Sequence, residues 1–74
     1  MQNIEISMEP IELYKVLKFG GIASSGGEAK MIVEQGHVSV NGSTETQKRK
    51  KIVSGDTISC QGQSFQIRLR ENPR

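Results

Sequence analysis

The segment Gly36–Gly42, with the sequence Gly-His-Val-Ser-Val-Asn-Gly, constrains the fold of this chain more than any other. Val38 and Val40 alternate with polar residues, which is the period of a half-buried strand. The Asn41-Gly42 pair that follows is a strong signal for a two-residue hairpin turn, because both positions of such a turn need positive φ. We therefore predict an antiparallel hairpin, with one strand over 37–40 and a return strand over about 43–46.

A first helix is predicted before this hairpin, over residues 10–19. Pro10 suits the first helical turn, where its missing N–H group costs nothing. Leu13, Val16 and Leu17 recur at i, i+3 and i+4, and they would form the stripe that faces the core. The Gly20-Gly21 pair is then expected to end the helix.

A second helix is predicted from Ser25 to about Gln35. Ser25 and Glu28 have the spacing of a capping box, and Gly36 would close the helix. Gly26 and Gly27 weaken its first turn by roughly 1 kcal/mol each relative to Ala. They would let a phosphate approach the free N–H groups of the helix start, although Glu28 would repel an anion. A flexible joint between the helices is the alternative explanation. The predicted buried residues are Ala29, Ile32 and Val33.

Further strands are predicted on both sides of this unit, over residues 3–7, 57–60 and 63–69. Their inward-facing residues would be Ile4, Ile6, Ile58, Cys60, Phe65, Ile67 and Leu69, with apolar packing also at Ile52 and Val53. The chain has 74 residues and shows no internal repeat or linker. We therefore expect one domain over 1–70 and a short C-terminal tail over 71–74.

Several function classes are disfavoured by what the sequence lacks. With one Cys and one His, the chain can form neither an intramolecular disulfide nor a Cys/His zinc site. No motif places a nucleophile beside a base, so we expect no catalysis, no cofactor and no small-molecule substrate. The chain has no Trp, one Tyr and two Phe, which gives little support for an aromatic platform. Without a secretory segment or an apolar stretch of ~20 residues, a cytoplasmic protein with no membrane partner is expected.

The string Lys48-Arg49-Lys50-Lys51 contains four of the ten Lys and Arg residues, although the net charge is only +2. Cations that neutralise phosphates release counterions, so such a string can bind a polyanion. A solvated loop is the alternative. Lys15, Lys18 and Lys30 favour binding if the fold brings them to the same side. His37 either contacts a nucleotide or is an ordinary surface histidine.

The residues from Ile11 to Ile58 resemble the S-four RNA-binding domain, also called the alpha-L motif. The resemblance rests on the leucine-bearing first helix, the serine-led second helix, the string Gly36–Gly42 and the Ser54-Gly55-Asp56 turn. It implies an α+β fold in which two packed helices lie against a small, mostly antiparallel sheet. It is closest to short free-standing bacterial members, which carry Ser-Gly-Gly-Glu-Ala-Lys and then a basic string. Many members place an Arg after the helix-starting serine, where this chain has Gly26.

The resemblance implies a non-catalytic protein that binds structured RNA, either ribosomal RNA or tRNA, through phosphates and shape. The alternative is a small adaptor that docks on an acidic protein of a ribosome-associated or RNA-processing complex. DNA binding is less favoured, because neither helix is rich in base-reading Arg, Asn or Gln. Asn41 matches the family but could serve only the turn. The candidate RNA-binding residues are Lys15, Lys18, Ser25, Gly26, Lys30, His37, Lys48, Arg49, Lys50 and Lys51.

Overall fold

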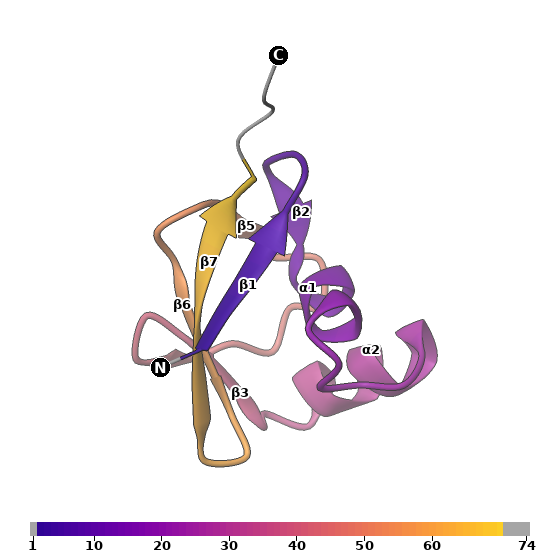
Figure 1. Ribbon diagram of the computed structural model, residues 1–74. Coiled ribbons are helices and arrows are strands. Elements are labelled where there is room, and N and C mark those ends of the chain that lie inside the picture. The colour runs from indigo at the N-terminus through magenta and orange to yellow at the C-terminus, as the bar shows by residue number, and fades with distance from the viewer. Residues whose placement is uncertain (1, 71–74) are drawn as a thin grey trace.

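The computed structural model describes residues 2–70, which form two packed helices against a five-stranded sheet, with a two-stranded ladder beside them (Figure 1). The predicted tail, residues 71–74, lies outside the described residues. In chain order the elements are β1 (Gln2–Ile6), β2 (Ile11–Glu12), α1 (Leu13–Phe19), α2 (Gly26–Glu34), β3 (Val38–Val40), β4 (Ser43–Thr44), β5 (Lys51–Ile52), β6 (Thr57–Cys60) and β7 (Gln63–Leu69).

The large sheet has the strand order β1-β7-β6-β3-β4. Only the β1–β7 pair is parallel, so the mostly antiparallel α+β fold implied by the family resemblance is confirmed. The predicted hairpin is also confirmed, since Val40 pairs with Ser43 across a turn with φ of 54° at Asn41 and 88° at Gly42. The return strand is shorter than predicted and ends at Thr44.

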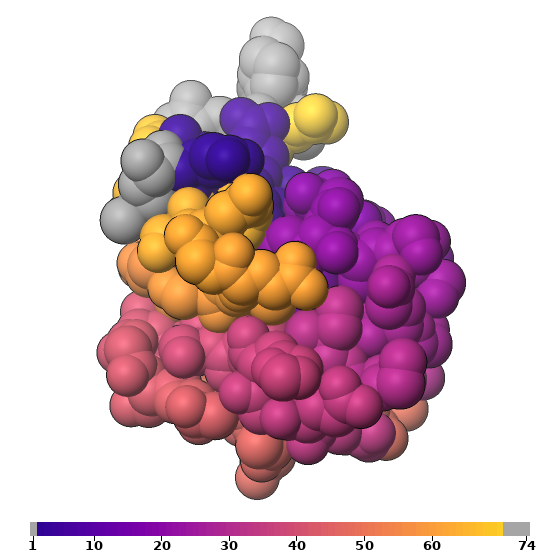
Figure 2. Space-filling model, turned by 90° about the horizontal axis from the view of Figure 1, so that it is seen from below, coloured from indigo at the N-terminus to yellow at the C-terminus, as the bar shows by residue number. Residues whose placement is uncertain are grey.

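The core fills the space between the sheet and the helices. The buried residues are Ile4, Ile6, Leu13, Val16, Leu17, Ala23, Ala29, Val33, Val38, Val40, Ile52, Ile58, Cys60, Phe65 and Ile67. Cys60 is 3% exposed, as predicted for a core residue, and burial raises the pKa of its thiol. Figure 2 shows the helices (purple to magenta) and the following hairpin (pink) as one continuous surface.

The prediction for the start of the first helix was wrong. Ile11 and Glu12 are extended and pair with Ile52 and Lys51 as the ladder β2–β5, so α1 begins at Leu13. This pairing occupies the backbone groups that a longer helix would need, and Pro10 lies in the connection before β2. The second helix agrees with its prediction, because Ser25 is the N-cap and the last helical residue is Glu34.

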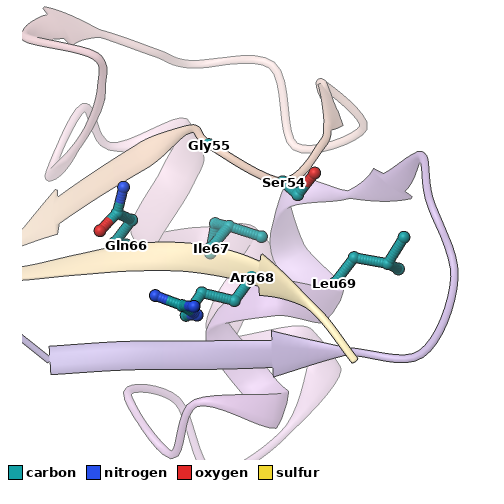
Figure 3. A pocket seen from close by; sticks show the side chains of 6 residues that line it. All are labelled: Ser54, Gly55, Gln66, Ile67, Arg68 and Leu69. Atoms are coloured by element: carbon teal, nitrogen blue, oxygen red, sulfur yellow. The ribbon is translucent and has the colours of Figure 1, made fainter. Parts of the chain in front are cut away.

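Three side chains predicted to be buried are more exposed than expected. Leu69 and Val53 are each 41% exposed, and Ile32 is only partly buried against the core. Leu69 is the last residue of β7, and this end of the strand lies above both helices in Figure 1. It lines a shallow hollow with Ser54 and Gly55 (Figure 3). No helix within residues 2–70 is long and apolar enough to span a membrane.

Candidate nucleic-acid interface

The basic string lies at the start of α1 and is fixed there by backbone hydrogen bonds. The N–H groups of Leu13 and Tyr14 donate to the carbonyls of Lys50 and Lys48, at 2.9 and 3.0 Å. The first N–H groups of a helix have no partner within it, and the N-cap residue of α1 provides no side-chain acceptor. The string therefore caps the helix, and its backbone is held to the fold by hydrogen bonds.

The ring of Tyr14 is the point where cations from α1, α2 and the basic string meet. The ammonium nitrogens of Lys15 and Lys30 lie 5.9 and 4.8 Å from the ring centre, and the guanidinium carbon of Arg49 lies 6.0 Å from it. Such cation–π contacts contribute about 0.5–1 kcal/mol each at exposed sites. Lys15, Lys30 and Arg49, together with Tyr14, form what we call the Tyr14 cluster.

Two glutamates partly neutralise cations of the Tyr14 cluster and of the basic string. Glu34 Oε2 lies 2.7 Å from Lys48 Nζ, and the two carboxylate oxygens of Glu12 lie 3.4 Å from Arg49 and 3.6 Å from Lys15. Desolvation raises the pKa of Glu12, but the charges of Arg49 and Lys15, together with hydrogen bonds from Tyr14 and Arg49, lower it more, so its pKa falls below the ordinary value. Exposed ion pairs contribute only about 0–1 kcal/mol, so a phosphate can displace a glutamate at low cost.

The other predicted cations are more dispersed. Lys50 and Lys51 are exposed, on the same string as Arg49. Lys18 is exposed in the last turn of α1, where its charge suits the negative end of the helix dipole, and it is not among the cations around Tyr14. His37 is exposed, and its backbone N–H donates to the Ile32 carbonyl at 3.2 Å, so this residue helps to end α2.

The start of α2 is capped by its own side chains. Ser25 Oγ accepts from the N–H of Glu28 at 3.1 Å, as the capping-box spacing predicts. The Glu28 carboxylate, however, accepts from the N–H and the hydroxyl of Ser24, at 2.6 and 2.7 Å. Both hydrogen bonds lower the pKa of Glu28, and the bond from the Ser24 backbone N–H has the larger effect. A phosphate at this helix end stays a prediction, and it would have to approach a carboxylate.

Gly26 lies beside the Tyr14 cluster. A Cβ built at Gly26 would stand 3.9 Å from Tyr14 Cε2, an ordinary van der Waals distance. The position where many family members carry an Arg is therefore adjacent to the Tyr14 ring, around which the cations of this chain lie. Tyr14 itself was missed by the sequence reasoning. Two signals could have pointed to it: it is the only tyrosine of the chain, and it stands next to Lys15.

Asn41 has a structural role that connects two turns. Its side-chain amide donates to Asp56 Oδ1 at 3.0 Å, and its carbonyl oxygen accepts from the N–H of Thr57 at 2.9 Å. Asp56 also accepts from the N–H of Val53 through its other oxygen, at 3.0 Å. The Asn41-Gly42 turn and the Gly55-Asp56 turn are therefore held together by these side-chain hydrogen bonds.

This fold, with a helix pair and a cationic surface at the start of α1, is that of an alpha-L domain. The S4 domain family matches residues 4–68, and the chain belongs to this family. YbcJ of Escherichia coli (strain K12), whose name proposes RNA binding, is 46% identical over 68 residues, which cover 90% of this chain and 97% of YbcJ.

Two further similarities agree with this assignment. RlbA of Bacillus subtilis (strain 168), whose name proposes a part in ribosome maturation, is 34% identical over 86% of this chain and 92% of RlbA. The solution structure of YbcJ superimposes with a TM-score of 0.70 and 40% identity, over 92% of this chain and 87% of that one. That structure is described as an alpha-L motif involved in RNA-binding.

Proposed function

We propose that this protein binds structured RNA, without catalysing a reaction, through the Tyr14 cluster and the basic string. The observation that carries the proposal is the convergence of Lys15, Lys30 and Arg49 on one ring, at the place where the string caps α1. The names of the relatives YbcJ and RlbA support it. The name of RlbA also favours ribosomal RNA over tRNA, and a ribosomal or RNA-processing protein as a neighbour.

Binding would proceed by exchange of ion pairs. RNA phosphates take the places of Glu12 and Glu34 beside the cations and release condensed counterions into solution. The sequence of the RNA is not read by such contacts, which fix position and orientation. The residues that we propose for this surface are Lys15, Lys18, Ser25, Gly26, Lys30, His37, Lys48, Arg49, Lys50 and Lys51. Of these, Lys18 and His37 belong neither to the Tyr14 cluster, nor to the basic string, nor to the start of α2, and they would contribute least.

A titration with a folded ribosomal RNA fragment at several salt concentrations tests the proposal. Affinity should fall with salt, and the double variant Arg49→Gln/Lys50→Gln should bind more weakly. Its plot of log affinity against log salt should also be shallower, by roughly 0.7–0.9 for each phosphate that the variant no longer neutralises. The matched control is Arg68→Gln/Arg70→Gln, which removes the same charge at the end of β7, where Arg70 pairs with Glu5 and neither residue is among the cations around Tyr14. Equal losses in both double variants would reject the proposed surface.

A further inference from the structure

A groove adjoins the Tyr14 cluster, between α1 and the connection from β1 to β2. Its volume is about 400 Å³, within the range of small-molecule sites. Met8 and Phe19 are 67% and 62% exposed, and both line this groove, so they form a shared exposed apolar surface. The lining residues are Ser7, Met8, Pro10, Ile11, Glu12, Lys15 and Phe19.

The groove combines an aromatic face with charged groups. Lys15 and Phe19 are four residues apart on α1, so they lie on the same helix face. Glu12 lines the same groove and lies 3.6 Å from Lys15, and the lowered pKa of its carboxyl keeps it ionised at neutral pH. The site therefore offers a flat apolar surface, a cation and a hydrogen-bond acceptor side by side.

The groove is continuous with the proposed RNA surface, because Lys15 and Glu12 belong to both. Lys15 is one of the three cations around Tyr14, and Glu12 pairs with both Lys15 and Arg49. A phosphate bound beside Lys15 would place its own nucleotide at the mouth of the groove. A nucleotide matches this combination, since it joins a phosphate to a flat base whose edge carries hydrogen-bond donors.

We propose that the groove holds one unpaired base of the bound RNA, stacked on Phe19. This inference rests on the proposed function, and it adds to it a site that distinguishes RNA with an unpaired nucleotide from a regular duplex. Sequence-specific recognition of RNA mainly targets loops and bulges, where bases leave the helix and stack on aromatic side chains. The chain has few aromatic residues, but one exposed Phe at a groove suffices for a single base.

The test uses two RNA duplexes that differ only by one bulged 2-aminopurine, a base whose fluorescence depends on its stacking. The wild-type protein should bind the bulged duplex more tightly and change its fluorescence. Phe19→Ala should weaken binding to the bulged duplex by roughly tenfold, given typical base–aromatic stacking, and abolish the fluorescence change. Binding to the fully paired duplex should be unchanged. Met31→Ala is the matched control, because Met31 is 51% exposed on α2 and does not line the groove.

Other outcomes overturn the inference in distinguishable ways. An equal loss of affinity for both duplexes, or no loss, would show that Phe19 does not hold a base. Concentration-dependent dimerisation that Phe19→Ala abolishes, measured by sedimentation, would assign the groove to a second copy of the chain. If the wild type binds neither duplex, the proposed function itself fails. If it binds both without the fluorescence change, only the groove is rejected.

Discussion

The ammonium nitrogen of Lys30 lies 4.8 Å from the ring centre of Tyr14, and this contact connects the second helix to the first at the surface of the domain. Arg49 approaches the same ring from the basic string, at 6.0 Å. A single uncharged side chain thus holds cations from separate parts of the sequence close together despite their mutual repulsion. The energetic reason is that each cation is attracted to the face of the ring.

Replacing Tyr14 should weaken RNA binding although it removes no charge. We expect Tyr14→Leu to reduce affinity about five- to tenfold, because the ring attracts three cations by about 0.5–1 kcal/mol each and these energies are not fully additive. Tyr14→Phe keeps the ring and should bind nearly as well as the wild type. Fluorescence anisotropy at fixed salt gives the affinities, and circular dichroism checks the fold. Equal affinity of the Leu and Phe variants would show that the ring does not organise the cations.

Asn41 should matter for stability and not for RNA affinity. Asn41→Gly keeps a residue that tolerates the φ of 54° but loses the bonds to Asp56 and Thr57, so we expect a loss of about 1–2 kcal/mol. Asn41→Ala should be less stable still, because Ala disfavours positive φ. Urea denaturation measures both variants. The prediction fails if Asn41→Gly is as stable as the wild type, or if either folded variant loses RNA affinity.

Acid should destabilise the protein partly through Glu28. The bonds from Ser24 lower the pKa of Glu28 from 4.5, so the folded state binds this proton less readily than the unfolded state. The resulting stabilisation is present above about pH 4.5 and is lost as the pH falls through the lower pKa of the folded state. We expect Glu28→Gln to lose less stability than the wild type between about pH 5 and pH 3, the range in which carboxyl groups ordinarily titrate. Parallel pH profiles of the two proteins would contradict this assignment.

Two glycines of the helix pair should respond to alanine in opposite directions. A Cβ at Gly27 would meet nothing closer than Ser25 Oγ at 4.0 Å, so Gly27→Ala should stabilise the helix by about 0.5–1 kcal/mol. A Cβ at Gly20 would stand 2.6 Å from Cδ1 of the buried Ile4. Gly20→Ala should therefore destabilise by about 1 kcal/mol, since the end of the Ile4 side chain can only partly yield. Thermal denaturation measures the change in Tm of both variants. A change in the same direction for both would refute the packing argument.

Local signals predicted much of the fold. The strands predicted over residues 57–60 and 63–69 have the same bounds as β6 and β7. Alternation of apolar and polar residues can be recognised within one strand, without knowing which strand it pairs with. The Asn41-Gly42 turn and the Ser25 cap were also found, since each depends on the conformational preferences of a few neighbouring residues. The family resemblance added how the helices and the sheet are arranged.

The sequence alone determined where the second helix, the hairpin and the last two strands of this protein lie, and that four cations follow one another. Only the tertiary structure decided that Ile11 and Glu12 join a ladder, that Leu69 is 41% exposed, and that the cations gather around Tyr14. These features depend on partners far away along the chain: Glu12 and Arg49, for example, are 37 residues apart. Local preferences cannot encode such contacts, because they exist only after the core has brought the segments together.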